Sequence, residues 1–331
     1  CRYYPQQGES NTPDGRSTGE VCRQNQWHHP PIGSHFLKTH SMMYISDEKA
    51  TDQLDAFILQ ALAEDTGSGD HTSLACIPEN SRSNAFLLVK EPGVLAGVEV
   101  ARRTFGLVAP DAVFTQHIED GADVSAGEIA FEVQCNTRLL LGVERVILNT
   151  MQRMSGIASL SNRFHFEVED LPVTILDTRK TTPLIRFLEK WAVRLGGCTN
   201  YRDGLYDRFL IKDNHIEACG SVRDAIEGVL AYRKANDLDD LGITIEVRNL
   251  VELYAAIEVG HIDRIMLDNF ELPLLQEAVD IVAGRYETEA SGGVNIHNVR
   301  KIALTGVNFI SVGALTHSAV GLDLSLKIRG H

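Results

Sequence analysis

Short apolar runs alternate with longer amphipathic segments over the second half of the chain. Six runs can form buried strands, and they cover residues 173–176, 209–211, 243–245, 265–267, 286–290 and 309–312. The segments between them are long enough for helices. Strands that alternate with helices are typical of parallel βα units. This half of the chain is therefore predicted to consist of such units.

Helical periodicity is clearest in three segments. Residues 52–62 and 137–155 repeat apolar side chains at helical spacing, which predicts two amphipathic helices. Residues 183–195 also fit a helix, because Thr182 can cap its start and Gly196 follows its end. The apolar face of this third helix is predicted to comprise Leu184, Phe187, Leu188, Trp191 and Leu195.

The composition is that of a globular enzyme with an acidic surface. The chain has 331 residues, 44% of them hydrophobic, and a formal net charge of -14. This charge argues against nucleic acid or a membrane surface as a partner. No run of 18 apolar residues occurs, so no transmembrane helix is predicted.

The amino-terminal part has a different composition. Residues 1–41 are rich in Gln, His, Pro, Gly and Asn and lack apolar periodicity, so we predict a disordered extension over residues 1–45. Met42 or Met43 is a plausible initiator. The six cysteines include no Cys-x-x-Cys pair, and we interpret them as free thiols in a reducing cytoplasm.

Polar residues or glycines follow the predicted strands. They are Asp177-Thr-Arg-Lys, Lys212-Asp-Asn-His, Glu246, Asp268-Asn, Ser291-Gly-Gly and Gly313. In a β/α barrel the carboxyl ends of the strands share one rim, so these residues are expected to meet there. Four cations in this region predict a pocket for a polyanion, namely Arg179, Lys180, Arg202 and Lys212. The alternative is four surface charges that never meet.

Two consecutive strand-to-helix turns predict a phosphate site. Ser291-Gly292-Gly293 forms one turn, and Gly313 opens the other, which leads to His317. Backbone N–H groups can approach an anion closely where no Cβ intervenes, and a following helix would assist. The same glycines also suit tight turns that bind no ligand.

Glu246 and Asp268 end successive predicted strands, and Lys212 ends another. Two carboxylates at one rim suit Mg²⁺, which completes its shell with substrate oxygens and water. Salt bridges to nearby cations and acid–base work are the alternatives for this pair. Lys212 fits either an anion clamp or a Schiff-base nucleophile, and the neighbouring cations favour the clamp.

Longer motifs carry a family resemblance that extends over residues 46–328. They lie at 177–183, 196–207, 211–216, 266–269, 289–293 and 311–318. The sequence resembles nicotinate-nucleotide pyrophosphorylase (carboxylating), also called quinolinate phosphoribosyltransferase, a pentosyltransferase of NAD biosynthesis. The resemblance implies that quinolinate and phosphoribosyl pyrophosphate give nicotinate mononucleotide, pyrophosphate and CO₂ with Mg²⁺.

The resemblance also implies an architecture. Residues 46–156 would form an open α/β sandwich domain with a linking helix, and residues 157–331 a partial parallel β/α barrel with a carboxy-terminal segment. The active unit would be a cytoplasmic homodimer or higher homo-oligomer. Each site would be completed by the partner's amino-terminal domain.

Site roles follow from the same resemblance. Arg179, Lys180, Arg202 and Lys212 would bind the quinolinate carboxylates, and Arg145 would reach in from the neighbouring subunit. Glu246 and Asp268 would hold Mg²⁺ or the ribose hydroxyls and, with Lys212, form the catalytic set. The ribose 5′-phosphate would lie against Ser291, Gly292, Gly293, Gly313 and His317. The implied chemistry is electrostatic stabilisation of an oxocarbenium-like ribose, followed by decarboxylation driven by the positive ring nitrogen.

Two positions depart from the family pattern. The family usually has histidine where this chain has Tyr201, which is predicted to bind substrate as a neutral hydrogen-bond donor. Arg248 replaces a residue that is usually acidic, a change expected to affect only the rim. Alternative functions are a phosphoribosyltransferase for another anionic ring, a non-catalytic phosphoribosyl-ligand binder, and a Schiff-base aldolase.

Overall fold

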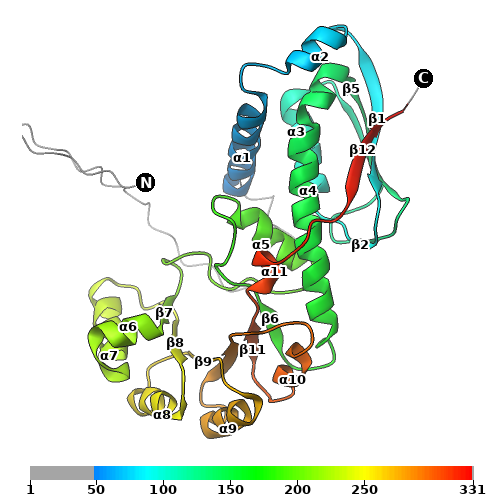
Figure 1. Ribbon diagram of the computed structural model, residues 1–331. Coiled ribbons are helices and arrows are strands. Elements are labelled where there is room, and N and C mark those ends of the chain that lie inside the picture. The colour runs from blue at the N-terminus through cyan, green and yellow to red at the C-terminus, as the bar shows by residue number, and fades with distance from the viewer. Residues whose placement is uncertain (1–47, 330–331) are drawn as a thin grey trace, which may run out of the picture. The chain divides into compact units, whose positions relative to one another are not determined.

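A computed structural model describes residues 48–329 (Figure 1). The extension predicted over residues 1–45, including its possible initiators, lies outside the described residues. Within the described part, two main sheets are formed, one antiparallel and one parallel. No helix of this part has the length and apolar character needed to cross a membrane.

The parallel sheet contains six strands in the order β6-β11-β10-β9-β8-β7. These strands are β6 (Thr174–Leu176), β7 (Phe209–Ile211), β8 (Ile243–Val247), β9 (Arg264–Asp268), β10 (Glu287–Ser291) and β11 (Phe309–Ser311). All neighbouring pairs are parallel. Among the described strands β6 and β7 remain the two edges, so the barrel is open. The predicted partial parallel β/α barrel is confirmed, with strand bounds within two residues of those expected.

Helices follow the strands of this sheet. They are α5 (Arg186–Leu195), α6 (Asp213–Cys219), α7 (Val222–Ala235), α8 (Leu250–Val259), α9 (Leu272–Val282), α10 (Val299–Ala303) and α11 (Ala314–His317). All five residues of β8 are buried, as expected for a central strand covered on both faces. The hydrophobic core of this half lies between the sheet and these helices.

Helix α5 begins three residues later than its sequence predicts. Leu184 has a left-handed backbone (φ 69°) and is 91% exposed, so it does not belong to the apolar face. Thr182 does not cap the helix, because its backbone N–H and its hydroxyl both donate to the carboxylate of Glu189. Glu189 is buried and also pairs with Arg153. The hydrogen bonds from Thr182 to the buried Glu189 carboxylate thus hold the segment before α5 in a non-helical conformation.

The antiparallel sheet belongs mainly to the amino-terminal half and has the order β12-β1-β5-β3. Its strands are β1 (Arg82–Val89), β3 (Val113–Gln116), β5 (Ile129–Asn136) and β12 (Leu324–Ile328), and β2 (Gly93–Val94) pairs separately with β4 (Asp123–Val124). The accompanying helices are α1 (Glu48–Thr66), α2 (His71–Cys76) and α3 (Val98–Val108). Strand β12, from the carboxy-terminal segment, pairs along β1 and so returns the chain to the first sheet.

Helix α4 (Thr137–Phe166) links the two halves and is longer than the predicted helix over 137–155. Its later turns continue to bury apolar side chains, among them Ile157 and Phe164. The carboxy-terminal segment crosses this helix before β12 (Figure 1). At the crossing, the backbone N–H of Leu322 donates to the carbonyl of Gln152. A Cβ on Gly156 would lie 2.0 Å from the carbonyl oxygen of Val320. The crossing therefore requires glycine at this position.

We predict that Gly156→Ala lowers the free energy of unfolding by about 1–3 kcal/mol, because the added methyl displaces the crossing segment. Gly142 in the same helix is the matched control, since a Cβ there meets nothing within 4 Å. Gly142→Ala should leave stability unchanged or raise it by about 1 kcal/mol through helix propensity. Denaturant unfolding measures both variants, and equal effects would contradict a tight crossing at Gly156.

Candidate active site

A cavity of about 760 Å³ opens at the carboxyl ends of the parallel strands. We call it the rim pocket. All the predicted site residues except Arg145 line it, namely Arg179, Lys180, Tyr201, Arg202, Lys212, Glu246, Asp268, Ser291, Gly292, Gly293, Gly313 and His317. Two further lining residues, Thr178 and Asn269, are expected at the rim from the sequence, without a role. The sequence prediction missed five others, which are Leu210, Met266, Val294, Ser311 and Ala314. Most of these adjoin a predicted residue or alternate with one along a strand.

Two guanidinium groups in the rim pocket are poorly compensated by the protein. Burial lowers the pKa of Arg202, and the nearby charge of Arg179 lowers it further. The Nε of Arg179 is buried and has no hydrogen-bond partner within residues 48–329. Two like charges held together, one with an unsatisfied donor, favour binding of an anion between or beside them.

Lys212 lies at the start of α6, directly after β7, with an exposed side chain. Its backbone N–H donates to Nδ1 of His215 at 2.9 Å. His215 therefore completes the first turn of α6, which accounts for this histidine without a ligand. The lysine side chain has no structural ion pair in the described part of the chain and is available to an anion in the pocket.

Glu246 and Asp268 lie on the adjacent strands β8 and β9 and point to the same face. Glu246 is in register with Met266, and Asp268 is two residues further along β9. Burial raises the pKa of Glu246, Asp268 raises it further, and Lys212 opposes the shift. The carboxylate of Asp268 accepts hydrogen bonds from the hydroxyl of Ser291 and the amide of Asn269, each at 2.7 Å.

This carboxylate pair is a partial metal site. Within residues 48–329, no cluster of three or more His, Cys, Asp or Glu side chains is placed to hold a metal ion. Mg²⁺ often takes only one or two protein carboxylates and completes its shell with water and substrate phosphates. Burial and, to a smaller extent, repulsion from Asp268 both raise the pKa of Glu246, and a bound cation would offset both effects. The residues present therefore fit Mg²⁺ bound together with a phosphorylated substrate.

The glycine turns keep part of the pocket free of side chains. Gly292 has φ 88°, and a Cβ there would lie 2.1 Å from the side-chain oxygen of Asn269. A Cβ on Gly313 would lie 2.8 Å from the Lys180 side chain and 3.3 Å from Nε2 of His317. The helix expected after the first turn is α10, which begins six residues after Gly293. Backbone N–H groups, not a helix dipole, are thus what this first turn can offer to an anion.

Tyr201 enters the rim pocket from a loop that is tied to the barrel at both backbone and side chain. Its backbone N–H donates to the buried carboxylate of Asp177 at 2.8 Å. Its phenol oxygen lies 2.8 Å from the hydroxyl of Thr244 on β8. Burial raises the pKa of Tyr201, and the nearby Glu289 raises it further, so the phenol is neutral near pH 7.

Two predicted features lie away from the rim pocket. Arg145 projects from α4 with its side chain 62% exposed, 3.8 Å from Glu144, and does not line the pocket. Arg248 pairs with Glu217 and Glu252 at the surface, and these partners raise its pKa. The expected effect of Arg248 on the rim stays a prediction.

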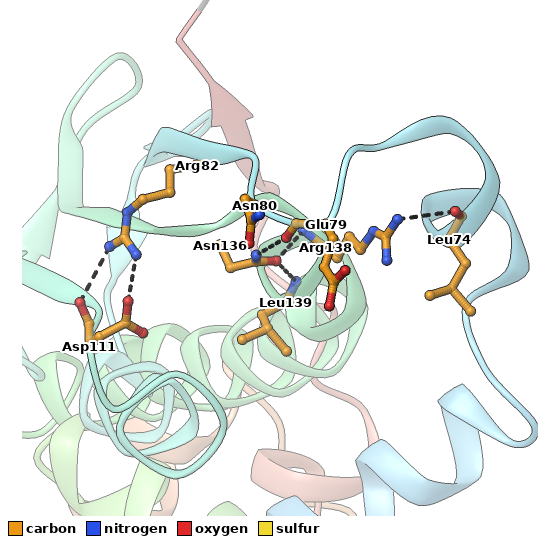
Figure 2. A pocket seen from close by; sticks show the side chains of 8 residues that line it. All are labelled: Leu74, Glu79, Asn80, Arg82, Asp111, Asn136, Arg138 and Leu139. Carbon is orange, nitrogen blue, oxygen red and sulfur yellow. Dashed lines mark hydrogen bonds and ion pairs between the residues drawn. The ribbon is translucent and has the colours of Figure 1, made fainter.

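A second cavity, of about 640 Å³, lies in the amino-terminal half (Figure 2). Figure 2 shows its polar groups paired with one another: Arg82 binds Asp111, and Arg138 donates to the carbonyl of Leu74. The amide of Asn136 donates to the carbonyl of Glu79. The arginines of this cavity are thus engaged by the protein, in contrast to Arg179 in the rim pocket.

Comparison with known proteins assigns both halves of the chain to one family. Residues 157–327 match the family described as quinolinate phosphoribosyl transferase, C-terminal domain, and residues 70–155 match its N-terminal domain. A relative named quinolinate phosphoribosyltransferase [decarboxylating] 1b from Nicotiana tabacum is 44% identical, covering 84% of this chain and 83% of the relative. A probable nicotinate-nucleotide pyrophosphorylase [carboxylating] from Bacillus subtilis is 38% identical, covering 83% and 93%.

Solved structures agree with the sequence relatives. The crystal structure of NadC from Streptococcus pyogenes superposes with a TM-score of 0.78 at 36% identity, covering 84% of this chain and 98% of that one. A nicotinate-nucleotide pyrophosphorylase from Ehrlichia chaffeensis superposes with a TM-score of 0.77 at 38% identity, covering 83% and 98%. The matches span both domains and the rim pocket, and the chain belongs to the quinolinate phosphoribosyltransferase family.

Proposed function

We propose that the protein transfers the phosphoribosyl group of phosphoribosyl pyrophosphate to quinolinate. The products are nicotinate mononucleotide, pyrophosphate and CO₂. The observation that carries this proposal is the combination of poorly compensated guanidinium groups and a carboxylate pair in one cavity. A dicarboxylate acceptor requires the first feature, and a pyrophosphate-bearing donor requires the second. The named relatives support the same reaction.

Quinolinate is expected to bind at the cationic wall of the rim pocket. Arg179 and Arg202 are the partly buried cations there, and Lys180 and Lys212 add exposed ammonium groups. Each quinolinate carboxylate that leaves water needs a cationic partner, because an unpaired buried charge is strongly unfavourable. Nicotinate has one carboxylate less and would leave part of this positive charge uncompensated.

Phosphoribosyl pyrophosphate is expected to bind against the glycine turns and the carboxylate pair. The turn with Gly292 and Gly293 and the turn with Gly313 offer backbone close to a 5′-phosphate, with His317 beside the second turn. Glu246 and Asp268 would hold Mg²⁺ or the ribose hydroxyls. When bound, Mg²⁺ supplies positive charge that balances the leaving pyrophosphate.

The chemistry proposed for these residues is positioning and electrostatic stabilisation. The carboxylates of Glu246 and Asp268 stabilise positive charge that develops on the ribose as pyrophosphate leaves. The cationic wall holds the pyridine ring so that its nitrogen faces the anomeric carbon. As CO₂ departs, the positive ring nitrogen stabilises the electron pair left on the adjacent ring carbon, and this carbon then takes up a proton. None of these steps requires a covalent enzyme intermediate.

A homodimer or higher homo-oligomer with shared sites is the proposed assembly. Arg145 is exposed and does not line the rim pocket of its own chain, as expected of a residue that acts in a neighbouring one. Large apolar side chains are exposed on loops of the barrel half, including Leu184, Leu205 and Tyr206. Contact with a second copy would remove this apolar surface from water.

We propose a cytoplasmic location, which rests on the sequence interpretation alone. Relatives from Nicotiana tabacum and Arabidopsis thaliana carry mitochondrial and chloroplastic in their names, so location varies among similar proteins. Imaging of the full chain with a fluorescent tag at its carboxyl end tests this proposal, and a signal confined to an organelle would contradict it.

The direct test of the proposed function is an assay of the purified protein with quinolinate, phosphoribosyl pyrophosphate and Mg²⁺. We expect CO₂ and nicotinate mononucleotide in equal amounts. Nicotinate offered in place of quinolinate should give little product. Turnover of nicotinate at a comparable kcat/KM would instead favour a phosphoribosyltransferase for another anionic ring.

We predict that Arg179→Ala and Lys212→Ala each reduce kcat/KM for quinolinate by about 30-fold or more, since a desolvated carboxylate loses a charged partner. Arg300→Ala is the control, because this arginine forms a surface pair with Asp170 outside the rim pocket. Its kcat/KM should match that of the wild type. Steady-state kinetics measures kcat/KM, and circular dichroism checks that each variant is folded. An Arg179→Ala variant with wild-type kcat/KM would contradict the role of Arg179 in binding the quinolinate carboxylates.

We predict that activation by Mg²⁺ weakens as pH falls, and that protonation of Glu246 causes this loss. Its pKa is raised, so the carboxylate takes up a proton at a higher pH than an ordinary glutamate and then no longer binds a cation. The Mg²⁺ concentration for half-activation should therefore rise as the pH is lowered from neutral into the acidic range. In Glu246→Gln it should be high at every pH. A normal Mg²⁺ requirement in that variant would exclude the carboxylate from the metal site.

We predict that inactive Arg145→Ala subunits mixed with inactive Lys212→Ala subunits recover activity. In a hybrid dimer, one site receives an intact Arg145 from one chain and an intact Lys212 from the other. Random exchange makes about half of the dimers hybrids, so roughly a quarter of wild-type activity should return. Activity is measured after unfolding and refolding the mixture, with hybrids verified by two affinity tags. Verified hybrids without activity would exclude a shared site.

A further inference from the structure

A chain of side-chain contacts runs beneath the rim pocket to the phenol of Tyr201. Arg208 Nε donates to the hydroxyl of Thr244 at 2.9 Å, and this hydroxyl lies 2.8 Å from the phenol oxygen of Tyr201. Thr244 is completely buried on β8. Tyr201 lines the rim pocket, whereas Thr244 and Arg208 do not. The side chains of these two inner residues reach the rim pocket through the tyrosine, while the backbone carbonyl of Arg208 also accepts from Arg202 at 3.4 Å.

The donor and acceptor inventory fixes the direction of these hydrogen bonds. The Arg208 guanidinium can only donate, so it occupies one lone pair of the Thr244 oxygen. Within residues 48–329, the phenol oxygen of Tyr201 is the one recorded acceptor for the threonine proton. If the tyrosine donated instead, a buried hydroxyl proton would lack an acceptor, which is unfavourable. Thr244 therefore donates to Tyr201, and the phenol proton must point elsewhere.

The tyrosine ring is held firmly in this position. The guanidinium carbons of Arg208 and Arg264 lie 5.9 Å and 5.2 Å from the ring centroid. Arg264 also stacks on Phe309 at 3.7 Å and pairs with the buried Glu289 at 3.0 Å. These contacts leave rotation of the phenol O–H as the main freedom of the side chain, and Thr244 removes that freedom as well.

We propose that Arg208 and Thr244 are positioning residues that turn the Tyr201 O–H into the rim pocket, where it donates to a carboxylate of the pyridine substrate. This inference rests on the proposed function, because it takes quinolinate as the ligand. The positive charge of Arg208 polarises the Thr244 hydroxyl, which in turn makes the phenol a better donor. The neutral phenol of Tyr201, polarised through Thr244 by the cation Arg208, thus donates a hydrogen bond to the substrate at a position where the family usually has a histidine.

The test is a double-mutant cycle between Thr244 and Tyr201. Tyr201→Phe should raise KM for quinolinate by about tenfold, the value for a hydrogen bond to a charged group. Thr244→Val keeps the shape but removes the hydroxyl, and it should raise the same KM by roughly threefold to tenfold. Thr244→Ser, which restores the hydroxyl, should return KM toward that of the wild type. In the Tyr201→Phe background, Thr244→Val should have no further effect.

The second substrate supplies an internal control. KM for phosphoribosyl pyrophosphate should stay unchanged in all these variants, whereas a general structural defect would alter both constants. Thr305→Val is the matched control, because this buried threonine bonds only the Ile302 carbonyl and lies outside the rim pocket. Equal losses from Thr244→Val in both backgrounds, or equal changes in both KM values, would overturn the proposal.

Arg208→Met provides a second route if Thr244→Val does not fold. It removes the guanidinium that polarises Thr244, and it should raise KM for quinolinate only when Tyr201 is present. Wild-type protein that does not turn over quinolinate would refute the proposed function itself. Wild-type protein that turns over quinolinate, with Thr244→Val and Arg208→Met both unchanged, would refute only the role of these positioning residues.

Discussion

A buried ion pair between Asp177 and Lys190 holds together the two loops that carry Arg179 and Arg202. Lys190 Nζ lies 2.6 Å from the Asp177 carboxylate, and both side chains are almost fully buried. Asp177 follows β6 directly, and the same carboxylate accepts from the backbone of Tyr201. Removing one partner of a buried pair typically costs about 3–5 kcal/mol, because the other charge is left uncompensated. The positions of Arg179 and Arg202 therefore depend on a charge pair that does not line the rim pocket.

The guanidinium groups of the rim pocket carry charge opposite in sign to the net charge of the chain. With a formal net charge of -14, the chain as a whole repels anions at long range. Close to the cationic wall of the rim pocket an anion is attracted instead, because Arg179 and Arg202 lie together and are partly shielded from water. Screening confines the repulsion of distant acidic groups to about 8 Å at physiological ionic strength. Nearby guanidinium groups thus decide whether a dicarboxylate binds.

The alternation of apolar runs and helical segments predicts the parallel sheet almost residue for residue. The reason is that each buried strand is recognisable from its own short run of apolar residues. The polar ends of the strands predict most of the rim pocket for the same reason. Other features depend on partners distant in sequence. Strand β12 pairs with β1 across more than two hundred residues, and no local signal near Leu324 indicates this partner. The late start of α5 likewise depends on Glu189 and its contact with Arg153.

The positioning residues beneath the pocket could not be predicted from local pattern, although a weak signal exists. Thr244 and Glu246 alternate with Ile243 and Ile245, which is unusual for a central strand buried on both faces. The alternation indicates that one face of β8 is polar, but only the register with β9 reveals that this face lines the pocket. The contact between Arg208 and Thr244 depends further on the loop before β7.

Strand register is consequently the constraint that links fold to chemistry at this site. Successive side chains of a strand point to opposite faces, so a shift of one residue between β8 and β9 would turn Glu246 into the apolar layer under the helices. Thr244 would turn with it, and Tyr201 would lose its hydrogen-bond donor. An unpaired carboxylate in an apolar layer is far less favourable than one facing Asp268 and a cation. The polar residues that serve the site thereby also exclude the wrong register of the sheet.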